Sequence, residues 1–180
     1  MMKPLYRFAP FLLLVLAACS QLTGPSASDY LERNVSVWNT LIAQVNQWSA
    51  GADAERLTAA MVARKDLANF KFNLGNARQQ ATDMRDQMKA LQVPDDAGEL
   101  HAKLVASLEV AVRWYDAMLT LTDLPDGFSD EQATPLLEAM DVEGSQFDTL
   151  TDELDKLQDA YASKHGISLH RNEDPSMRGR

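Results

Sequence analysis

The strongest constraint on the fold is a run of apolar side chains that recur at steps of three and four residues between positions 53 and 92. The run comprises Ala60, Ala63, Leu67, Phe70, Leu74, Ala77, Ala81, Met84, Met88 and Leu91. This spacing puts about one apolar side chain per turn on a single side of an α-helix, as at the a and d positions of a coiled coil. The run therefore predicts one long helix from about Asp53 to Gln92 that packs against other helices.

The remainder of the chain is also periodic in the helical sense, and it has no alternating, β-branched stretch bounded by hairpin turns. We therefore expect an all-α, up-down-up-down four-helix bundle that forms a single domain over residues 29–165. From Gly166 the chain is polar and aperiodic, so residues 166–180 are predicted to be a disordered tail. The four helices are predicted to span residues 29–48, 53–92, about 96–123 and 129–164.

Helix caps and breakers set the predicted boundaries. Ser28 is the expected N-cap of the first helix, and Asp95 or Asp96 is the expected N-cap of the third. The sequence Ser129-Asp130-Glu131-Gln132 has the pattern of a capping box at the start of the fourth. Pro135 either starts the main part of this helix or removes a hydrogen bond within it and bends it.

Charged residues spaced by seven give an independent estimate of how the second and third helices pair. Basic side chains follow the inward positions of the second helix, and acidic ones follow those of the third. In an antiparallel hairpin, the numbers of paired residues have a constant sum. A sum of 187 puts the turn between Val93 and Pro94, beside the proline, and predicts the pairs Arg78 with Glu109, Lys71 with Asp116, and Arg64 with Asp123.

The start of the chain has the features of an export signal. Lys3 and Arg7 precede a short apolar run, residues 8–16, that closes on Leu16-Ala17-Ala18-Cys19. This segment resembles the signal peptide and lipobox of bacterial lipoproteins. The resemblance implies cleavage after residue 18, a diacylglyceryl group and an N-acyl chain on Cys19, and a flexible tether over residues 19–28.

The same resemblance implies where the protein resides. Ser20 follows Cys19, where an Asp would favour retention in the inner membrane. We therefore expect the periplasmic face of the outer membrane if the organism has two membranes, and otherwise the outer face of the plasma membrane. Several acyl chains make such an anchor effectively stable.

The composition of the mature chain excludes several classes of function. Cleavage would leave 180 − 18 = 162 residues with 15 basic and 26 acidic side chains, a net charge of −11, which argues against binding to nucleic acid. Cys19 is the only cysteine, so no intramolecular disulfide can form. We find no motif for zinc, haem or a di-metal site, and we expect no cofactor other than the covalent lipid.

The histidines and methionines do not change this expectation. His101, His165 and His170 are not spaced as a ligand cluster. Four methionines would suit copper(I) but fall on predicted core positions, where Met is an ordinary filler. These methionines are Met84, Met88, Met118 and Met140.

Two polar surfaces are candidate partner-binding sites. The first is an acidic strip on the fourth helix, which is either a solvated face or a docking surface for a basic partner or a weak divalent-cation site. It comprises Asp141, Asp148, Asp152, Asp155 and Asp159. The second is an amide face, which either borders the core or recognises a polar ligand or an envelope glycan. It comprises Asn69, Asn73, Asn76 and Gln80, with Phe72 as an aromatic contact beside them.

These features favour a lipid-anchored, non-catalytic accessory, scaffold or interaction protein that binds another envelope protein. The alternative is a bundle that binds a small ligand or a metal, as a sensor or carrier. A third hypothesis is an enzyme whose site has no motif. The first predicts a solid core with function on an outer face, and the second predicts an internal cavity lined by polar groups.

Overall fold

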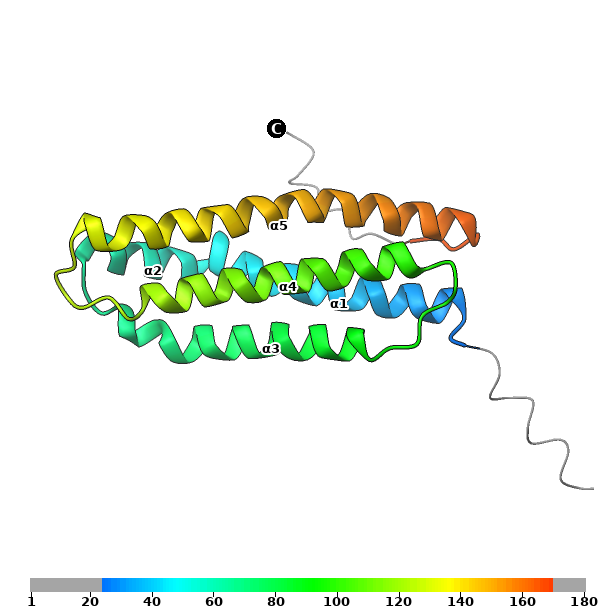
Figure 1. Ribbon diagram of the computed structural model, residues 1–180, viewed down its shortest axis with the longest axis horizontal. Helices are drawn as coiled ribbons and strands as arrows, with labels where there is room; N and C mark the ends of the chain where they lie inside the picture. Colours follow the sequence, from blue (N-terminus) through cyan, green and yellow to red (C-terminus); the bar gives the residue numbers. More distant parts are fainter. Residues whose placement is uncertain (1–23, 170–180) are drawn as a thin grey trace, which may run out of the picture.

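The computed structural model describes residues 24–169, and all regular secondary structure in that range is helical, which confirms the predicted all-α class. Figure 1 shows the helices lying alongside one another as an elongated bundle. In chain order they are α1 (Ala27–Ser49), α2 (Ala52–Ala63), the 3-10 helix η1 (Leu67–Phe70), α3 (Lys71–Lys89), α4 (Gly98–Leu121) and α5 (Asp130–Lys164).

Several predictions concern residues outside this range. The signal peptide, Cys19, Ser20 and the first part of the tether lie outside the described residues, as do His170 and the remainder of the predicted tail. Of the tail residues that are described, Ile167 and Leu169 are half-buried and pack against the core.

Helix α4 lies at the centre of the bundle and packs on α3, α5 and α1. Its predicted inward residues are all buried, and they form one core with α1 and the second half of α5. Leucine-sized and larger side chains at this spacing remove most of their apolar surface from water, which is the main stabilising term of the fold. These residues are Leu104, Leu108, Ala111, Tyr115 and Met118.

The predicted long helix over residues 53–92 is wrong, because the chain breaks at Arg64–Asp66 into α2 and α3. Arg64 and Asp66 adopt left-handed backbone conformations, with φ of 51° and 65°. A non-glycine residue is rarely stable there unless the surroundings hold it. Ala63, a predicted core position, is consequently exposed, whereas Leu67 remains buried.

The α4–α5 loop supplies the contacts that hold this break. The N–H of Gly127 donates to the Arg64 carbonyl oxygen at 2.7 Å. The N–H of Asp66 donates to the Asp126 carboxylate at 2.9 Å. The Arg64 guanidinium donates to the Phe128 carbonyl oxygen at 3.2 Å. We call residues 64–66 and 126–130 together the corner.

The chain reverses its direction at the corner and not between α1 and α2. Instead of folding back on α1, α2 follows α1 along the same side of the bundle, and α3 then runs back beside α4 (Figure 1). The single long helix α5 therefore lies along both α1 and α2. The start of α1 lies near residues 167–169, which follow α5. Arg64, just after the end of α2, pairs with Asp130 at the start of α5 at 2.6 Å.

Two of the predicted caps are wrong. Helix α1 is capped by Ser26 rather than Ser28, since the Ser26 hydroxyl accepts from the Asp29 N–H at 3.1 Å. Helix α4 starts after Ala97 without a side-chain cap. Asp96, which was expected to cap it, instead accepts from Lys164 at 2.6 Å at the far end of α5.

The capping box of α5 is confirmed. The Ser129 N–H donates to the Gln132 side-chain oxygen at 2.9 Å. Pro135 does not start the helix but lies within it, in the second turn. Because proline has no N–H, the backbone loses one hydrogen bond at this point.

Helices α3 and α4 form the expected antiparallel hairpin, but the predicted pairing is wrong by seven residues. Arg78 pairs with Asp116 at 3.0 Å, and Lys71 pairs with Asp123 at 2.6 Å, so paired numbers sum to 194. The Cα–Cβ bonds of a helix lean toward its own N-terminus. In an antiparallel pair, side chains that lean in this way meet when their Cα atoms are offset along the axis. The residue numbers of the ion pairs therefore sum to more than those of residues whose Cα atoms lie level.

The corrected pairing predicts a measurable coupling between Arg78 and Asp116. In a double-mutant cycle with R78A and D116A, we expect a coupling free energy of about 0.2–1 kcal/mol, because the pair is partly exposed. Urea unfolding measures it, and the cycle of R78A with E109A is the control. A coupling found only in the Arg78–Glu109 cycle would restore the pairing inferred from the sequence.

Candidate functional site

An open apolar cleft of about 750 Å³ lies where the end of α1, α2, α4 and the first half of α5 meet. Volumes of this size are typical of ligand and peptide sites. The side chains that line it are predominantly hydrophobic and aromatic. They include Ile42, Val45 and Trp48 of α1, Leu57 of α2, Trp114 and Met118 of α4, and Leu137, Met140 and Phe147 of α5.

Gly144 contributes to the opening. It lies on the side of α5 that faces α4, and a Cβ atom placed there would meet only the Trp114 Nε1 atom, at 3.7 Å. The absence of a side chain thus leaves space between α4 and α5. Leu137, which lines the cleft and is 38% exposed, extends the apolar surface outward.

Aromatic contacts support the walls of the cleft from behind. The rings of Trp38 and Phe147 lie 5.7 Å apart, and those of Trp114 and Tyr115 lie 5.3 Å apart. Tilted ring pairs at these distances are favourable beyond the area they bury. The cleft is therefore built on buried, mutually packed rings.

Of the predicted acidic strip, only Asp141 and Asp148 line the cleft. Both are exposed, and neither forms an ion pair with any residue between 24 and 169. Asp152 is exposed but does not line the cleft. Asp155 is half-buried and Asp159 exposed. The five aspartates therefore do not form one uniform surface, because only two of them line the cleft.

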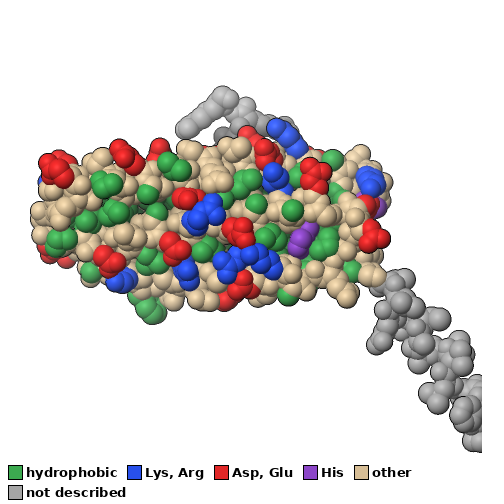
Figure 2. Space-filling view, in the orientation of Figure 1, with side chains coloured by type: hydrophobic (Ala, Val, Ile, Leu, Met, Phe, Trp, Pro, Cys, Tyr) green, Lys and Arg blue, Asp and Glu red, His purple; other side chains and the backbone are tan. Residues whose placement is uncertain are grey.

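Two acidic side chains of α5 close to the cleft are paired with cations of α4. Arg113 of α4 binds the Glu143 carboxylate at 3.0 Å, and Lys103 binds Glu153 at 2.6 Å, where it holds the pKa of that carboxyl below its ordinary value. Figure 2 shows acidic and basic side chains mixed along this face. Asp141 and Asp148, like Glu138 and Asp152 of the same helix, have no ion pair within residues 24–169, and they differ from those two residues in lining the cleft.

The predicted amide face is partly assembled in the structure. Asn73, Asn76 and Gln80 of α3 line a shallow groove of about 280 Å³ together with residues of α1 and α2. Gln80 accepts a hydrogen bond from Gln44 of α1, in accord with the interpretation that these amides border the core. Asn69 lies in η1, is exposed and does not line this groove.

Phe72, on α3, is 76% exposed and does not line the groove either. Asp53, which the sequence did not single out, is buried beside the groove and accepts hydrogen bonds from Gln47 and Arg56. Its carboxylate is thus satisfied within the protein. The groove is shallow and smaller than the cleft, which makes it a weaker candidate.

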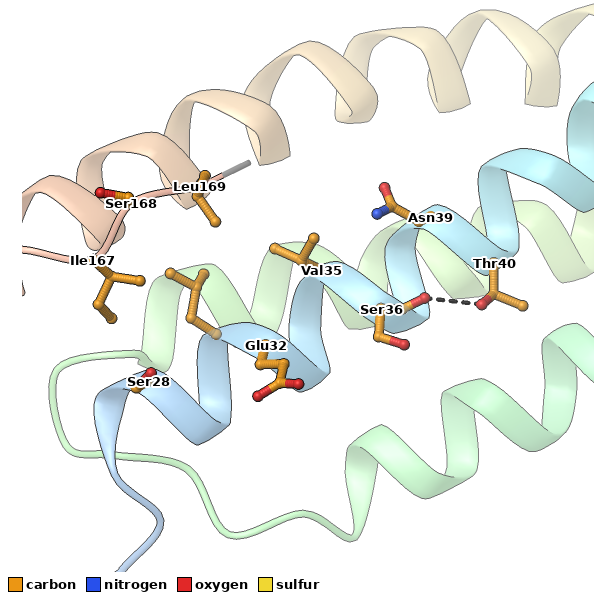
Figure 3. Close-up of a pocket in the computed structure, with 10 residues that line it drawn as sticks. Ser28, Glu32, Val35, Ser36, Asn39, Thr40, Ile167, Ser168 and Leu169 are labelled. Atoms are coloured by element: carbon orange, nitrogen blue, oxygen red, sulfur yellow. Dashed lines mark hydrogen bonds between the residues drawn. The ribbon is translucent and has the colours of Figure 1, made fainter. Parts of the chain in front are cut away.

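A second groove on α1 is covered at one end by residues 167–169. Figure 3 shows Ile167 and Leu169 lying against α1, on the side from which Val35 projects. The N–H of Ile167 donates to the Ala162 carbonyl oxygen at 2.9 Å, which turns the chain back after α5. This groove is therefore occupied in part by the protein itself.

A buried polar cluster links α1 to α5 and was not anticipated. Gln158 donates to the Asn34 side-chain oxygen at 2.9 Å, and Asn34 donates to the Tyr30 hydroxyl at 3.3 Å. Burial raises the pKa of Tyr30 to about 12 and lowers the pKa of His101, whose ring centroid lies 6.1 Å from that of Tyr30. The cluster fixes the pairing of the two helices rather than forming a cavity.

Neither metal binding nor membrane crossing is visible in residues 24–169. In this range no three or more His, Cys, Asp or Glu side chains are grouped so that they could hold a metal ion. None of the helices described is long and apolar enough to cross a membrane.

The chain has no match among protein-family models, curated proteins or solved structures.

The open space at Gly144 predicts the effect of a methyl group there. We expect G144A to raise the free energy of unfolding by about 0.5–1 kcal/mol, because alanine is a better helix former and its Cβ meets only an ordinary contact. G75A is the matched control, since a Cβ at Gly75 of α3 meets nothing within 4 Å. Denaturant unfolding measures both, and a loss of stability in G144A alone would mean that α4 and α5 are closed at this point.

Proposed function

We propose that the chain is a lipid-anchored, non-catalytic interaction protein of the cell envelope, which holds an apolar, cationic segment of a partner protein in the cleft. In this proposal the domain is an up-down-up-down bundle, in which α1 and α2 together form the first leg and α3, α4 and α5 form the others. The only covalent addition is the lipid on Cys19.

The proposed anchor sets where the cleft lies. Eight residues from Cys19 to Ser26 span at most about 26 Å when fully extended. The cleft begins at Ile42, fifteen residues into α1, which is about 22 Å along that helix. A partner would therefore be bound away from the anchored end of the bundle, on the periplasmic face of an outer membrane or the outer face of a plasma membrane.

The observation that carries the proposal is the combination of apolar walls with two unpaired carboxylates at the mouth of the cleft. Apolar side chains of a partner would move out of water into the cleft, and the partner's cationic groups would pair with Asp141 and Asp148. An interaction protein is expected to have a solid core and to bind its partner on an outer face. The cleft is open to solvent, and we propose that it is the part of the outer surface that binds the partner.

A small-molecule carrier is the second candidate function, and the volume of the cleft favours it. At about 750 Å³, the cleft falls within the range of small-molecule sites. Its lining is mainly apolar and includes the polar side chains Asn46, Thr58 and Ser145, whereas the carrier hypothesis expected an internal cavity. We put the carrier second because the cleft is open to solvent and not enclosed.

Cross-linking in intact cells, followed by purification of the anchored protein, tests the proposed function. We expect an envelope protein to be recovered with the wild-type chain, and D141N/D148N to recover much less of it because the cleft has lost its charge. D152N is the control, since Asp152 is exposed on the same helix but outside the cleft. Equal recovery with all three proteins, or no reproducible partner, would contradict the proposal and favour the carrier.

The anchor is tested separately. The variant C19S is expected to lose incorporation of labelled palmitate and to leave the membrane fraction, because it lacks the thiol that receives the lipid. Retention of C19S in the membrane fraction with an unchanged lipid label would contradict lipidation at this residue.

A further inference from the structure

We infer that the segment recognised by the cleft is an amphipathic α-helix that presents two cationic side chains seven residues apart, flanked by apolar residues. This inference rests on the proposed function, and it specifies the partner element for the same site. It follows from the length of the cleft, the spacing of its acids and the small side chains on its floor.

The cleft is elongated along α5. The residues of α5 that line it run from Leu137 to Thr151 and recur every three or four positions, so they occupy one continuous side of the helix. Fourteen helical steps correspond to about 21 Å. An occupant that contacts the whole cleft is therefore long and narrow, with the dimensions of about four turns of helix.

The two carboxylates fix where positive charge must lie on that occupant. Asp141 and Asp148 are two turns apart on α5, which is about 10 Å along the axis, and both line the cleft. One compact cation cannot contact both. Two Lys or Arg side chains spaced by seven on a helix alongside α5 match this separation, because they also project from one side two turns apart.

The floor of the cleft allows a helix to approach α5. Gly144 and Ser145 face the cleft between the two acids, and Ala111 of α4 is fully buried behind them. Helices pack at interaxial distances of about 8–10 Å, and the closest approaches need small side chains at the contact. The bulky residues Leu137 and Met140, which are partly exposed, lie beside these small residues, where apolar side chains of the bound helix would pack.

A second copy of this chain does not fit these requirements. Its own cleft carries the same two aspartates, so two clefts placed face to face would repel each other. On its α3 and α4, Arg78, Lys71 and Arg113 are engaged in ion pairs within the bundle. The occupant that satisfies the cleft is a cationic helix from another protein.

Two synthetic peptides of about 18 residues, long enough to have measurable helicity, test the inference. Both contain the same Leu, Ala, Gln and Lys residues. In the first, two Lys residues lie seven apart beside a stripe of Leu. In the second, one Lys is moved to the opposite side of the helix. The lipidated full chain is held in nanodiscs of neutral lipid, so that the peptides are not attracted to the membrane, and calorimetric titration gives the Kd.

We expect the first peptide to bind about fivefold more tightly than the second, because it alone reaches both carboxylates. D141N and D148N are each expected to weaken the affinity of the first peptide about twofold to fivefold. The second peptide can reach only one carboxylate, so only one of these two variants should weaken its affinity. D152N is expected to change the affinity of neither peptide. Equal affinity of the two peptides, or an effect of D152N as large as that of D148N, would overturn the inference.

The outcome also separates this inference from the proposed function. If cross-links to an envelope protein in cells depend on Asp141 and Asp148 while the two peptides bind equally or not at all, the cleft is a docking site but does not recognise a helix with this spacing. If both the cross-links and peptide binding are insensitive to the two aspartates, the proposed function fails as well.

Discussion

The break in the chain at Arg64–Asp66 is the constraint on which the rest of the structure depends. Two residues in left-handed conformations are held there by the α4–α5 loop, through hydrogen bonds to the Arg64 carbonyl and the Asp66 N–H. Helix α2 continues along α1 past Ala50 and Gly51 and ends beside the start of α5, and at the break the chain turns back into α3 (Figure 1). The cleft lies between α1, α2, α4 and α5, and the corner holds the end of α2 against the start of α5.

The sequence predicted the parts of the fold that depend on local periodicity. The inward residues of α4, the capping box at Ser129 and the α3–α4 hairpin follow from spacing and caps within one or two helices. The break could not be predicted in this way, since Ala63 continues the apolar pattern and residues 60–70 contain no glycine or proline. The contacts that stabilise the break come from residues about 60 positions away, and tertiary contacts of this kind outweigh local helix preference.

The candidate site was predictable only in part. The sequence identified Asp141 and Asp148 as members of an acidic strip, but their difference from Asp152 arises from α1, α2 and α4, which form the other walls of the cleft. The buried polar cluster left a signal that was missed: Asn34 lies three residues after Leu31 and four before Trp38, on the inward stripe of α1. A polar residue at such a position needs a buried partner, and Gln158 of α5 provides it.

We propose that the cleft beside the chain break binds a partner protein at the membrane. Photo-cross-linking in intact cells tests this proposal most directly, with a photo-reactive amino acid in place of either Leu137, at the cleft, or Phe72, on the exposed side of α3. The account predicts an adduct with another envelope protein from position 137 and none from position 72. An adduct from position 72 alone would contradict it, because the partner would then bind the opposite side of the bundle from the cleft.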